Sequence, residues 1–250
     1  MVTFALAAWT LLKREIVRFW RQKSRVMGVV ASPLLFWLIV GFGSGETGPA
    51  FFFPGTVTLT VMFSAIFSTI SIIEDRREGF LLSMLVSPAP RSSLVIGKVL
   101  GSATLAWIQG VILLVFAPLA GVQLTLTGSL AIAGIVYLVA FCLSALGFLI
   151  AWKFDSTQGY HAVMNLLLLP MWLVSGSIFS IGSAHGWVRS IMWVNPLTYA
   201  QGTLRRLMTP DLAASEPAIN ISLIVLLAFA VALVIGSVAM ARRPAAQVSA

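Results

Sequence analysis

The sequence predicts an all-α integral membrane protein with six transmembrane helices, and three observations support this prediction. Apolar residues make up 59% of the 250 residues and charged residues only 10%, whereas about a quarter of a soluble domain is charged. The apolar residues form long uncharged segments separated by short charged ones. Basic residues gather in some connecting segments and are scarce in others, as in multi-pass membrane proteins. This composition excludes a water-soluble fold.

Each long uncharged segment is assigned to one transmembrane span, because about 20 helical residues cross a bilayer core of about 30 Å. The predicted spans cover residues 26–42, 51–73, 99–120, 130–152, 163–181 and 219–241. Residues 121–128 begin and end with glycine and reverse the chain between the third and fourth spans. The chain is thus predicted to be one membrane domain over residues 1–250, with spans one to five in 26–181 and a tail at 242–250.

The basic residues predict the orientation of these spans. Thirteen of the 16 lysines and arginines lie on the side of the membrane that holds the N-terminus. The other side holds Arg189, Arg205 and Arg206. Since cytoplasmic loops are enriched in basic residues, both termini are predicted to be cytoplasmic.

An amphipathic interface helix is predicted within residues 1–25, before the first span. Trp9, Leu12, Ile16, Phe19 and Trp20 share one face of a helical wheel over residues 9–25. The opposite face carries a stripe of four arginines: Arg14, Arg18, Arg21 and Arg25. The stripe faces lipid headgroups or an acidic patch on a partner, and simple anchoring of the helix to lipid is the alternative.

A short helix is predicted between the second and third spans. A charged run precedes it, and the run is made up of Glu74, Asp75, Arg76, Arg77 and Glu78, followed by Gly79. The apolar segment contains Phe80, Leu81, Leu82, Met84 and Leu85 and ends at the proline stop of Pro88. Two helical turns cannot cross a bilayer, so this helix is predicted to insert into a groove on a cytoplasmic protein. Folding back onto the membrane or the first helix is the alternative.

The outer region at residues 182–218 is predicted to form a re-entrant pair of short helices that closes the exit path as a gate. Residues 187–194 are too apolar for a solvated loop and too few to span. Asn195 suits the cap and Pro196 the first turn of a second helix. The predicted gate residues are Trp187, Trp193, Asn195, Pro196, Tyr199 and Arg205. Arg205 and Arg206 are expected to meet lipid headgroups or an anionic exported molecule, and anchoring in the outer leaflet is the alternative role of the region.

Several chemical signatures are missing from the sequence. No G-x-x-x-x-G-K-[ST] phosphate loop is present, so the chain is not expected to hydrolyse ATP itself. His161 and His185 are assigned to loops on opposite faces of the membrane, and the polar residues within the spans are neutral. A catalytic or metal site, a cofactor on this chain and an ion-driven relay are therefore not expected.

Two motifs resemble a known family. The run from Ile73 to Lys98, with Gly79-Phe80-Leu81, Ser87-Pro88 and Gly97-Lys98, is similar to the ABC type-2 permeases. The run from Asn195 to Ala200, followed by Arg205, looks like that family's motif before the last span. These permeases are the membrane subunits of bacterial ATP-binding-cassette exporters for drugs, lipo-oligosaccharides and polysaccharides.

The resemblance implies that residues 74–87 couple the permease to an ATPase subunit and that residues 9–25 form the interface helix. It further implies two ATPase copies that bind ATP and Mg²⁺, a second permease copy as homodimer or heterodimer, and the bacterial cytoplasmic membrane as location. Membrane lipids are expected partners and nucleic acid is not. The alternatives are an ATP-independent channel or ion-coupled carrier, a haem exporter subunit and a membrane scaffold.

Overall fold

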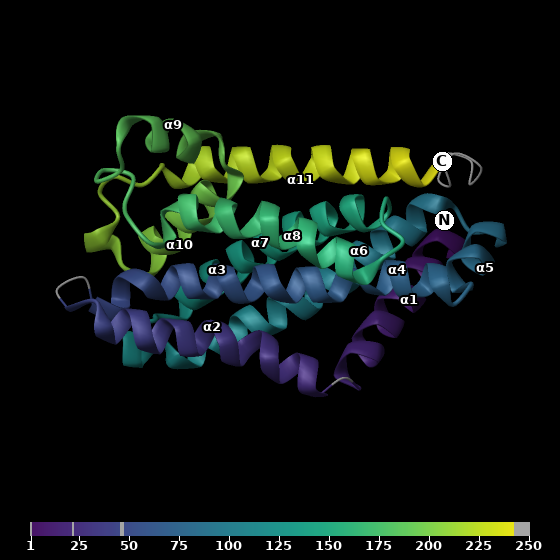
Figure 1. Cartoon of the computed structure of the whole chain (residues 1–250), viewed down its shortest axis with the longest axis horizontal. Helices are drawn as coiled ribbons and strands as arrows, with labels where there is room; N and C mark the ends of the chain where they lie inside the picture. The colour runs from purple at the N-terminus through teal and green to yellow at the C-terminus, as the bar shows by residue number, and fades with distance from the viewer. Residues whose placement is uncertain (1, 22, 46–47, 243–250) are drawn as a thin grey trace.

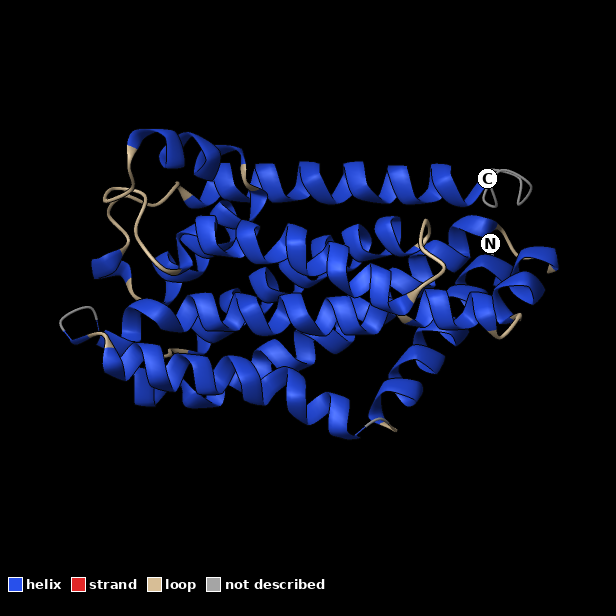
Figure 2. Cartoon of the chain, viewed as in Figure 1, coloured by secondary structure: helices blue, strands red, loops and turns tan. Residues whose placement is uncertain are grey.

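The computed structural model describes residues 2–21, 23–45 and 48–242, and within these residues it contains helices and loops but no strand (Figure 2). The long helices are α1 (Val2–Trp20), α2 (Lys23–Gly43), α3 (Gly48–Thr69), α6 (Arg91–Leu113), α7 (Leu126–Ala151), α8 (Thr157–Trp172) and α11 (Ile219–Arg242). The short ones are α4 (Ser71–Arg77), α5 (Phe80–Val86), α9 (Gly186–Val194) and α10 (Pro196–Met208). Two 3₁₀ helices, η2 (Leu114–Ala120) and η4 (Pro210–Leu212), and one π-helical turn, η3 (Leu173–Ser177), complete the described elements.

The long helices from α2 to α11 run along the long axis of the molecule, whereas α1 is inclined to it (Figure 1). The helices α4 and α5 lie at one end, together with both ends of the chain (Figure 1). The helices α9 and α10 lie at the opposite end. We call these the α5 end and the α9 end. The two segments predicted to face opposite sides of the membrane are therefore at opposite ends of the bundle.

The helix α3 forms the centre of the bundle and packs against α2, α6 and α7. Phe53, Val57 and Met62 are fully buried in it. Its buried threonines satisfy their hydroxyl groups locally, since Thr56 donates to the carbonyl of Phe52 at 3.0 Å and Thr58 to that of Pro54 at 3.1 Å. Local hydrogen bonds of this kind let polar side chains lie in a membrane helix at little cost.

Helix length and composition support a multi-pass membrane protein. Four helical segments of the described chain are long and apolar enough to cross a bilayer: Gly48–Arg77, Arg91–Ala120, Leu126–Ala151 and Ile219–Arg242. These correspond to predicted spans two, three, four and six. Met27–Gly43 in α2 is a shorter apolar helix. The predicted reversal after span three is confirmed, because Gly121 ends η2 with a φ of 76° and Thr125 caps α7.

The fifth predicted span differs from the structure. The helix α8 begins at Thr157, which places His161 in a helix and not in a loop, and it ends at Trp172. The next residues form the wide turn η3, in which Gly176 has a φ of 93°. The Ser175 hydroxyl donates to the carbonyl of Trp172 at 2.6 Å, and such side-chain bonds compete with the helical pattern. The prediction of one helix over 163–181 was therefore wrong at its C-terminal end.

The first helix is also shorter than predicted. α1 ends at Trp20 and a new helix, α2, begins at Lys23, so one helix does not extend to residue 25. The helix α1 packs across α6 at two glycines. A Cβ atom on Gly97 would lie 2.8 Å from the carbonyl oxygen of Ala8, and one on Gly101 would lie 2.9 Å from the Cβ of Glu15. Small residues permit this close helix contact, as in other membrane bundles.

This packing predicts that Gly97→Ala destabilises the protein. The added methyl group meets a backbone atom that cannot rotate away, and overpacking of this kind costs about 1–3 kcal/mol. That cost exceeds the gain of about 1 kcal/mol from alanine in a helix. We expect a lower melting temperature in detergent. The control is Gly134→Ala in α7, where nothing lies within 4 Å of the added Cβ. A melting temperature of Gly97→Ala at or above wild type would contradict the contact.

Candidate functional site

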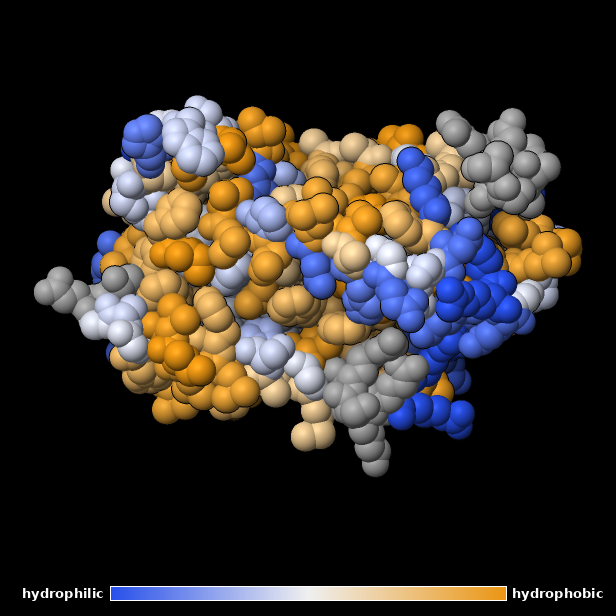
Figure 3. Space-filling model, in the orientation of Figure 1, coloured by the Kyte–Doolittle hydropathy of each residue, from blue (hydrophilic) through white to orange (hydrophobic). Residues whose placement is uncertain are grey.

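The α4–α5 hairpin lies at the most charged part of the surface. Gly79 joins the two helices with a φ of 76°, a conformation that favours glycine. On the face shown in Figure 3, hydrophilic residues gather around this hairpin, while apolar residues cover the middle of the bundle. Such a distribution fits a polar end of a membrane protein and an apolar belt around its helices.

The helix α5 presents an apolar surface to the outside. Leu82 is 62% exposed and Val86 is 76% exposed, whereas Leu81 is buried at 5%. Met84 and Leu85 are partly buried and pack against the core. A groove of about 320 Å³ lies beside the helix, between α1, α5 and the start of α6. The short helix is confirmed, and its outward face is formed by Leu82 and Val86.

The Asp75 carboxylate in α4 is the centre of a buried ion network. It is fully buried, and its oxygens accept hydrogen bonds from Arg14 at 2.8 and 3.0 Å and from Arg18 at 2.8 Å. Lys98 of α6 also donates to it. The Lys98 amine donates in addition to Glu15 at 2.5 Å and to the hydroxyl of Ser71 at 3.2 Å. The network therefore joins α1, α4 and α6.

The arginines of α1 contact both helices of the hairpin. Arg18 also pairs with Glu74 at 2.9 Å and with Glu78 at 3.2 Å. The guanidinium carbon of Arg14 lies 3.8 Å from the centre of the Phe80 ring, within the range of a cation–π contact. The network thus holds α5 as well as α4 against α1.

A second set of contacts clamps α4 from the other side. Arg76 donates to the carbonyl oxygens of Trp152 at 2.5 Å and Phe154 at 3.2 Å, and pairs with Asp155 at 2.6 Å. Arg77 donates to the backbone carbonyl of Asp155 at 2.9 Å. These bonds join α4 to the loop between α7 and α8. The hairpin is therefore fixed to α1 on one side and to the α7–α8 loop on the other.

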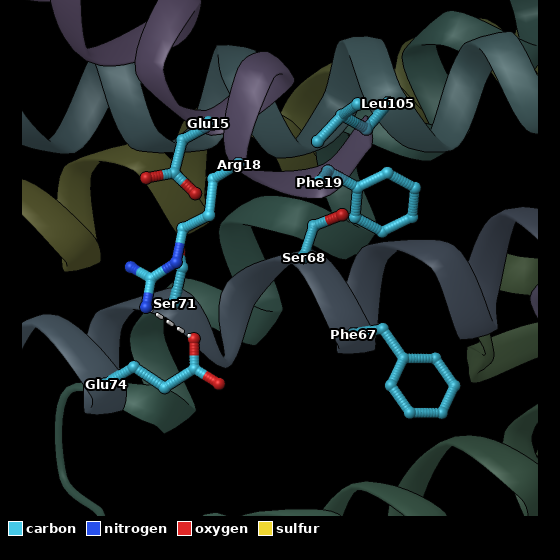
Figure 4. A pocket seen from close by; sticks show the side chains of 8 residues that line it. All are labelled: Glu15, Arg18, Phe19, Phe67, Ser68, Ser71, Glu74 and Leu105. Carbon is cyan, nitrogen blue, oxygen red and sulfur yellow. Dashed lines mark ion pairs between the residues drawn. The ribbon is translucent and has the colours of Figure 1, made fainter. Parts of the chain in front are cut away.

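A small cavity of about 10 Å³ lies within the network (Figure 4). Glu15 and Arg18 of α1 point toward Glu74, Ser68 and Ser71 across it (Figure 4). The buried Ser68 hydroxyl has no hydrogen-bond partner. A space of this size with polar walls has room for about one water molecule.

The structure supplies partners within the chain for several charged residues. Arg14 and Arg18, predicted to face headgroups or an acidic patch on a partner, pair with Asp75, which is buried beneath them, while their own side chains remain 31% and 22% exposed. A helical wheel places charges toward water, yet here the carboxylates of α4 offset the cost of burying them. Arg21 is exposed, and the side chain of Arg25 lies outside the described residues. The residues of the predicted site that stay exposed near the hairpin are Arg77, Glu78, Gly79, Leu82 and Pro88.

Two residues of the network were not among the predicted site residues. Glu15 is the only acidic residue of α1, and Lys98 lies inside an apolar helix. The predicted third span begins at residue 99, whereas α6 begins at Arg91. Lys98 was therefore placed just outside the span, among the basic residues of the N-terminal side.

The predicted pair of short helices is present at the α9 end. The Asn195 side chain accepts a hydrogen bond from the backbone N–H of Leu197 at 3.0 Å and so caps α10, and Pro196 follows at its first turn. The same side chain donates to the carbonyl of Met171 in α8 at 2.6 Å. Both predictions for this junction are confirmed, and the cap is also a link to α8.

The aromatic residues of this region lie on the surface. Trp187 is 67% exposed and Trp193 is 44% exposed. The Tyr199 hydroxyl donates to the carbonyl of Trp193 at 2.8 Å and joins α10 to the end of α9. An open apolar groove of about 800 Å³ separates α9 from α8.

Arg205, expected to meet lipid headgroups or an anionic exported molecule, has a buried partner within the chain. It is fully buried and pairs with the buried Glu216. It also donates to the carbonyl of Gly176 in η3 at 2.5 Å, and its guanidinium carbon lies 4.1 Å from the centre of the Phe51 ring. Arg206 donates to the carbonyl oxygens of Glu216 and Pro217. Sequence reasoning missed Glu216, the only carboxylate that pairs with Arg205 in the described chain.

The ion pair between Arg205 and Glu216 adds little net free energy to the stability of the fold. Burial raises the pKa of the Glu216 carboxyl, and the neighbouring charge of Arg205 opposes this rise. The desolvation of both charges offsets much of their attraction. Loss of one partner would nevertheless leave the other charge buried and uncompensated.

We expect Asn195→Ala to lower the free energy of unfolding by about 1 kcal/mol through loss of the α10 cap, with a further loss from the bond to Met171. Thermal unfolding in detergent measures this change. The control is Asn165→Ala, which removes an exposed amide from α8 and should leave the melting temperature almost unchanged. Equal melting temperatures for wild type and Asn195→Ala would contradict the role of this side chain.

A helical bundle with an apolar belt and a charged hairpin at one end (Figure 3) is the architecture of a multi-pass membrane protein. Residues 7–209 match the family described as ABC-2 type transporter. This match covers most of the chain, and the chain belongs to that family. It is a permease of an ABC transporter, a transport subunit and not an enzyme.

Relatives with curated names agree with this assignment. The chain is 26% identical over 215 residues to ycf38 of Cyanophora paradoxa, named as a transport permease, over 81% of this chain and 74% of the relative. It is 26% identical over 227 residues to ycf38 of Porphyra purpurea, over 85% and 77% of the two chains. YbhR of Escherichia coli (strain K12), named as a multidrug ABC transporter permease, is 27% identical over 155 residues, which are 61% of this chain and 42% of YbhR.

Proposed function

We propose that the chain is the membrane subunit of an ATP-driven exporter and that a separate ATPase subunit binds the outward face of α5. The exposed pair Leu82 and Val86 is the observation that carries this proposal. A two-turn apolar helix fixed on two sides by ion pairs suits insertion into a groove on a partner. The surrounding exposed charges, such as Arg77 and Glu78, then favour one orientation of that partner.

The energy source is proposed to lie on the partner chain. The sequence lacks a phosphate-binding loop of the G-x-x-x-x-G-K-[ST] kind, so ATP and Mg²⁺ would bind the ATPase subunit. Two ATPase subunits and two permease copies, identical or different, would form the transporter. The α5 end would face the cytoplasm of a bacterium, because most basic residues of the chain lie there.

The crossing of the membrane is proposed to use six helices: α2, α3, α6, α7, α8 and α11. They run along one axis between the α5 end and the α9 end (Figure 1), and both ends of the chain lie at the α5 end, as an even number of spans requires. The cargo is proposed to be a drug, a lipid, a lipo-oligosaccharide or a polysaccharide. The segment from α9 to residue 218 would dip into the outer leaflet and act as the outer gate.

The docking proposal predicts that Leu82→Asp releases the ATPase subunit. A carboxylate at this position would enter an apolar groove without a partner, at a cost on the order of 3 kcal/mol or more, which reduces affinity by more than about a hundredfold. Co-purification of the ATPase subunit from detergent-solubilised membranes measures the effect.

The matched control for docking is Leu212→Asp, which places the same charge on a 42% exposed leucine at the α9 end. This control should retain the ATPase subunit. Full retention by Leu82→Asp, together with normal ATP-driven transport, would rule out α5 as the docking element. Transport without any ATPase subunit would favour a channel or carrier.

A further inference from the structure

We infer that Lys98 is a positioning residue that passes movement of the α4–α5 hairpin to the transmembrane helix α6. This inference rests on the proposed docking of an ATPase subunit on α5. It concerns a step after docking, because Lys98 is buried and cannot touch a partner at the surface.

The Lys98 amine is the direct side-chain link between α4 and α6. Backbone contacts between α4 and α6 are sparse in the described chain, yet the amine binds both Asp75 of α4 and Glu15 of α1. All three side chains are at most 3% exposed. Charge-assisted hydrogen bonds between buried groups are among the strongest side-chain contacts, so a displacement of Asp75 acts on α6 through Lys98.

The hairpin continues the helical backbone of α3. Ile70, between α3 and α4, keeps helical φ and ψ angles of −55° and −31°, and its carbonyl accepts hydrogen bonds from the N–H groups of both Ile73 and Glu74 at 2.9 and 3.1 Å. Asp75 lies one turn beyond Ile70 and moves with α4, so a force on α5 displaces its carboxylate.

Two carboxylates near the network border a small cavity. This cavity of about 10 Å³ has Glu15 and Glu74 in its wall (Figure 4) and has room for about one water molecule. On its far side α4 is tied to the loop before α8 through Arg76 and Asp155. Movement of α4 therefore reaches α6 through Lys98 and the loop before α8 through Arg76.

A purely structural role for Lys98 makes a different prediction. Replacement of a buried ion pair by apolar or neutral side chains of similar size is often tolerated. The double variant Glu15→Gln/Lys98→Met removes both charges together and leaves Asp75 paired with Arg14 and Arg18. We therefore expect it to fold with a melting temperature close to wild type and to retain the ATPase subunit. Its defect should appear only in the response of the transmembrane helices to ATP.

The test uses the complete complex in lipid nanodiscs and needs no cargo. Spin labels are attached to cysteines at Leu119 and Leu212, both exposed, in a Cys142→Ser background. Leu119 follows α6 directly, so the distance between the labels reports movement of α6 at the α9 end. Addition of ATP and vanadate should change this distance in the labelled parent. In Glu15→Gln/Lys98→Met the change should be lost while ATPase co-purification persists. Lys13→Met, which removes an exposed charge from α1, should behave like the parent.

Two results would overturn the inference. An unchanged distance response in the double variant would show that the bridge does not transmit movement. Loss of the ATPase subunit from the double variant would show that Lys98 only supports the docking surface. Failure of the wild-type chain to bind any ATPase subunit would instead refute the proposed function. The test therefore distinguishes failure of the role of Lys98 from failure of ATPase docking.

Discussion

Asp75→Asn is expected to lower the free energy of unfolding by about 3–5 kcal/mol, the cost of leaving buried charges without their partner. Asp75 accepts hydrogen bonds from Arg14, Arg18 and Lys98 and is fully buried. An asparagine of the same size cannot offset these charges and places its amide donors against three cations. Thermal or denaturant unfolding in detergent measures the loss.

The matched control lies in the same network. Glu78 also pairs with Arg18, but its side chain is 58% exposed. Glu78→Gln should therefore cost at most about 1 kcal/mol, as exposed ion pairs do. Equal effects of Asp75→Asn and Glu78→Gln would show that the network is not buried as described.

Glu216→Gln should destabilise the α9 end to a similar extent, by about 3–5 kcal/mol. The substitution leaves Arg205 buried with only carbonyl groups and the Phe51 ring as partners. Because Arg205 contacts η3, α3 and the loop before α11, the outer helices should lose their fixed position. Proteolysis of the α9 end in nanodiscs should become faster, and the melting temperature should fall.

Two further variants make this prediction specific. The double variant Arg205→Met/Glu216→Leu removes both charges and should recover much of the stability, since buried pairs are often replaceable by apolar residues. Asp211→Asn, at an exposed position nearby, should have little effect. A double variant less stable than Glu216→Gln would contradict the assignment of the loss to an uncompensated charge.

Local signals in the sequence predicted the short elements well. The apolar run from Phe80 to Val86 lies between a glycine and a proline-rich stop, and it forms α5 over the same residues. Asn195 and Pro196 carry the usual signals of a helix start, and α10 begins there. Such signals need only a few neighbouring residues, so one sequence is enough to read them.

The partners of the buried charges could not be predicted in this way. Lys98 and Glu15 are 83 residues apart in the sequence, and Arg14 and Asp75 are 61 apart. A helical wheel assigns charged residues to the outside, and it fails where tertiary structure supplies an opposite charge. The end of α8 was missed for a related reason, because the serine hydroxyls and Gly176 change the backbone within an otherwise apolar run.

Site-specific cross-linking from α5 tests the docking proposal most directly. In a Cys142→Ser background, a photoreactive maleimide on a cysteine at Leu82 should form a covalent product with the ATPase subunit in native membranes. A cysteine at the neighbouring Leu81, which is 5% exposed, serves as the buried control, and one at Leu212 reports the α9 end. We predict a cross-linked product from Leu82→Cys and none from the other two. Docking on α5 is contradicted if Leu82→Cys gives no product in membranes that transport with ATP, or if Leu212→Cys gives as much product as Leu82→Cys.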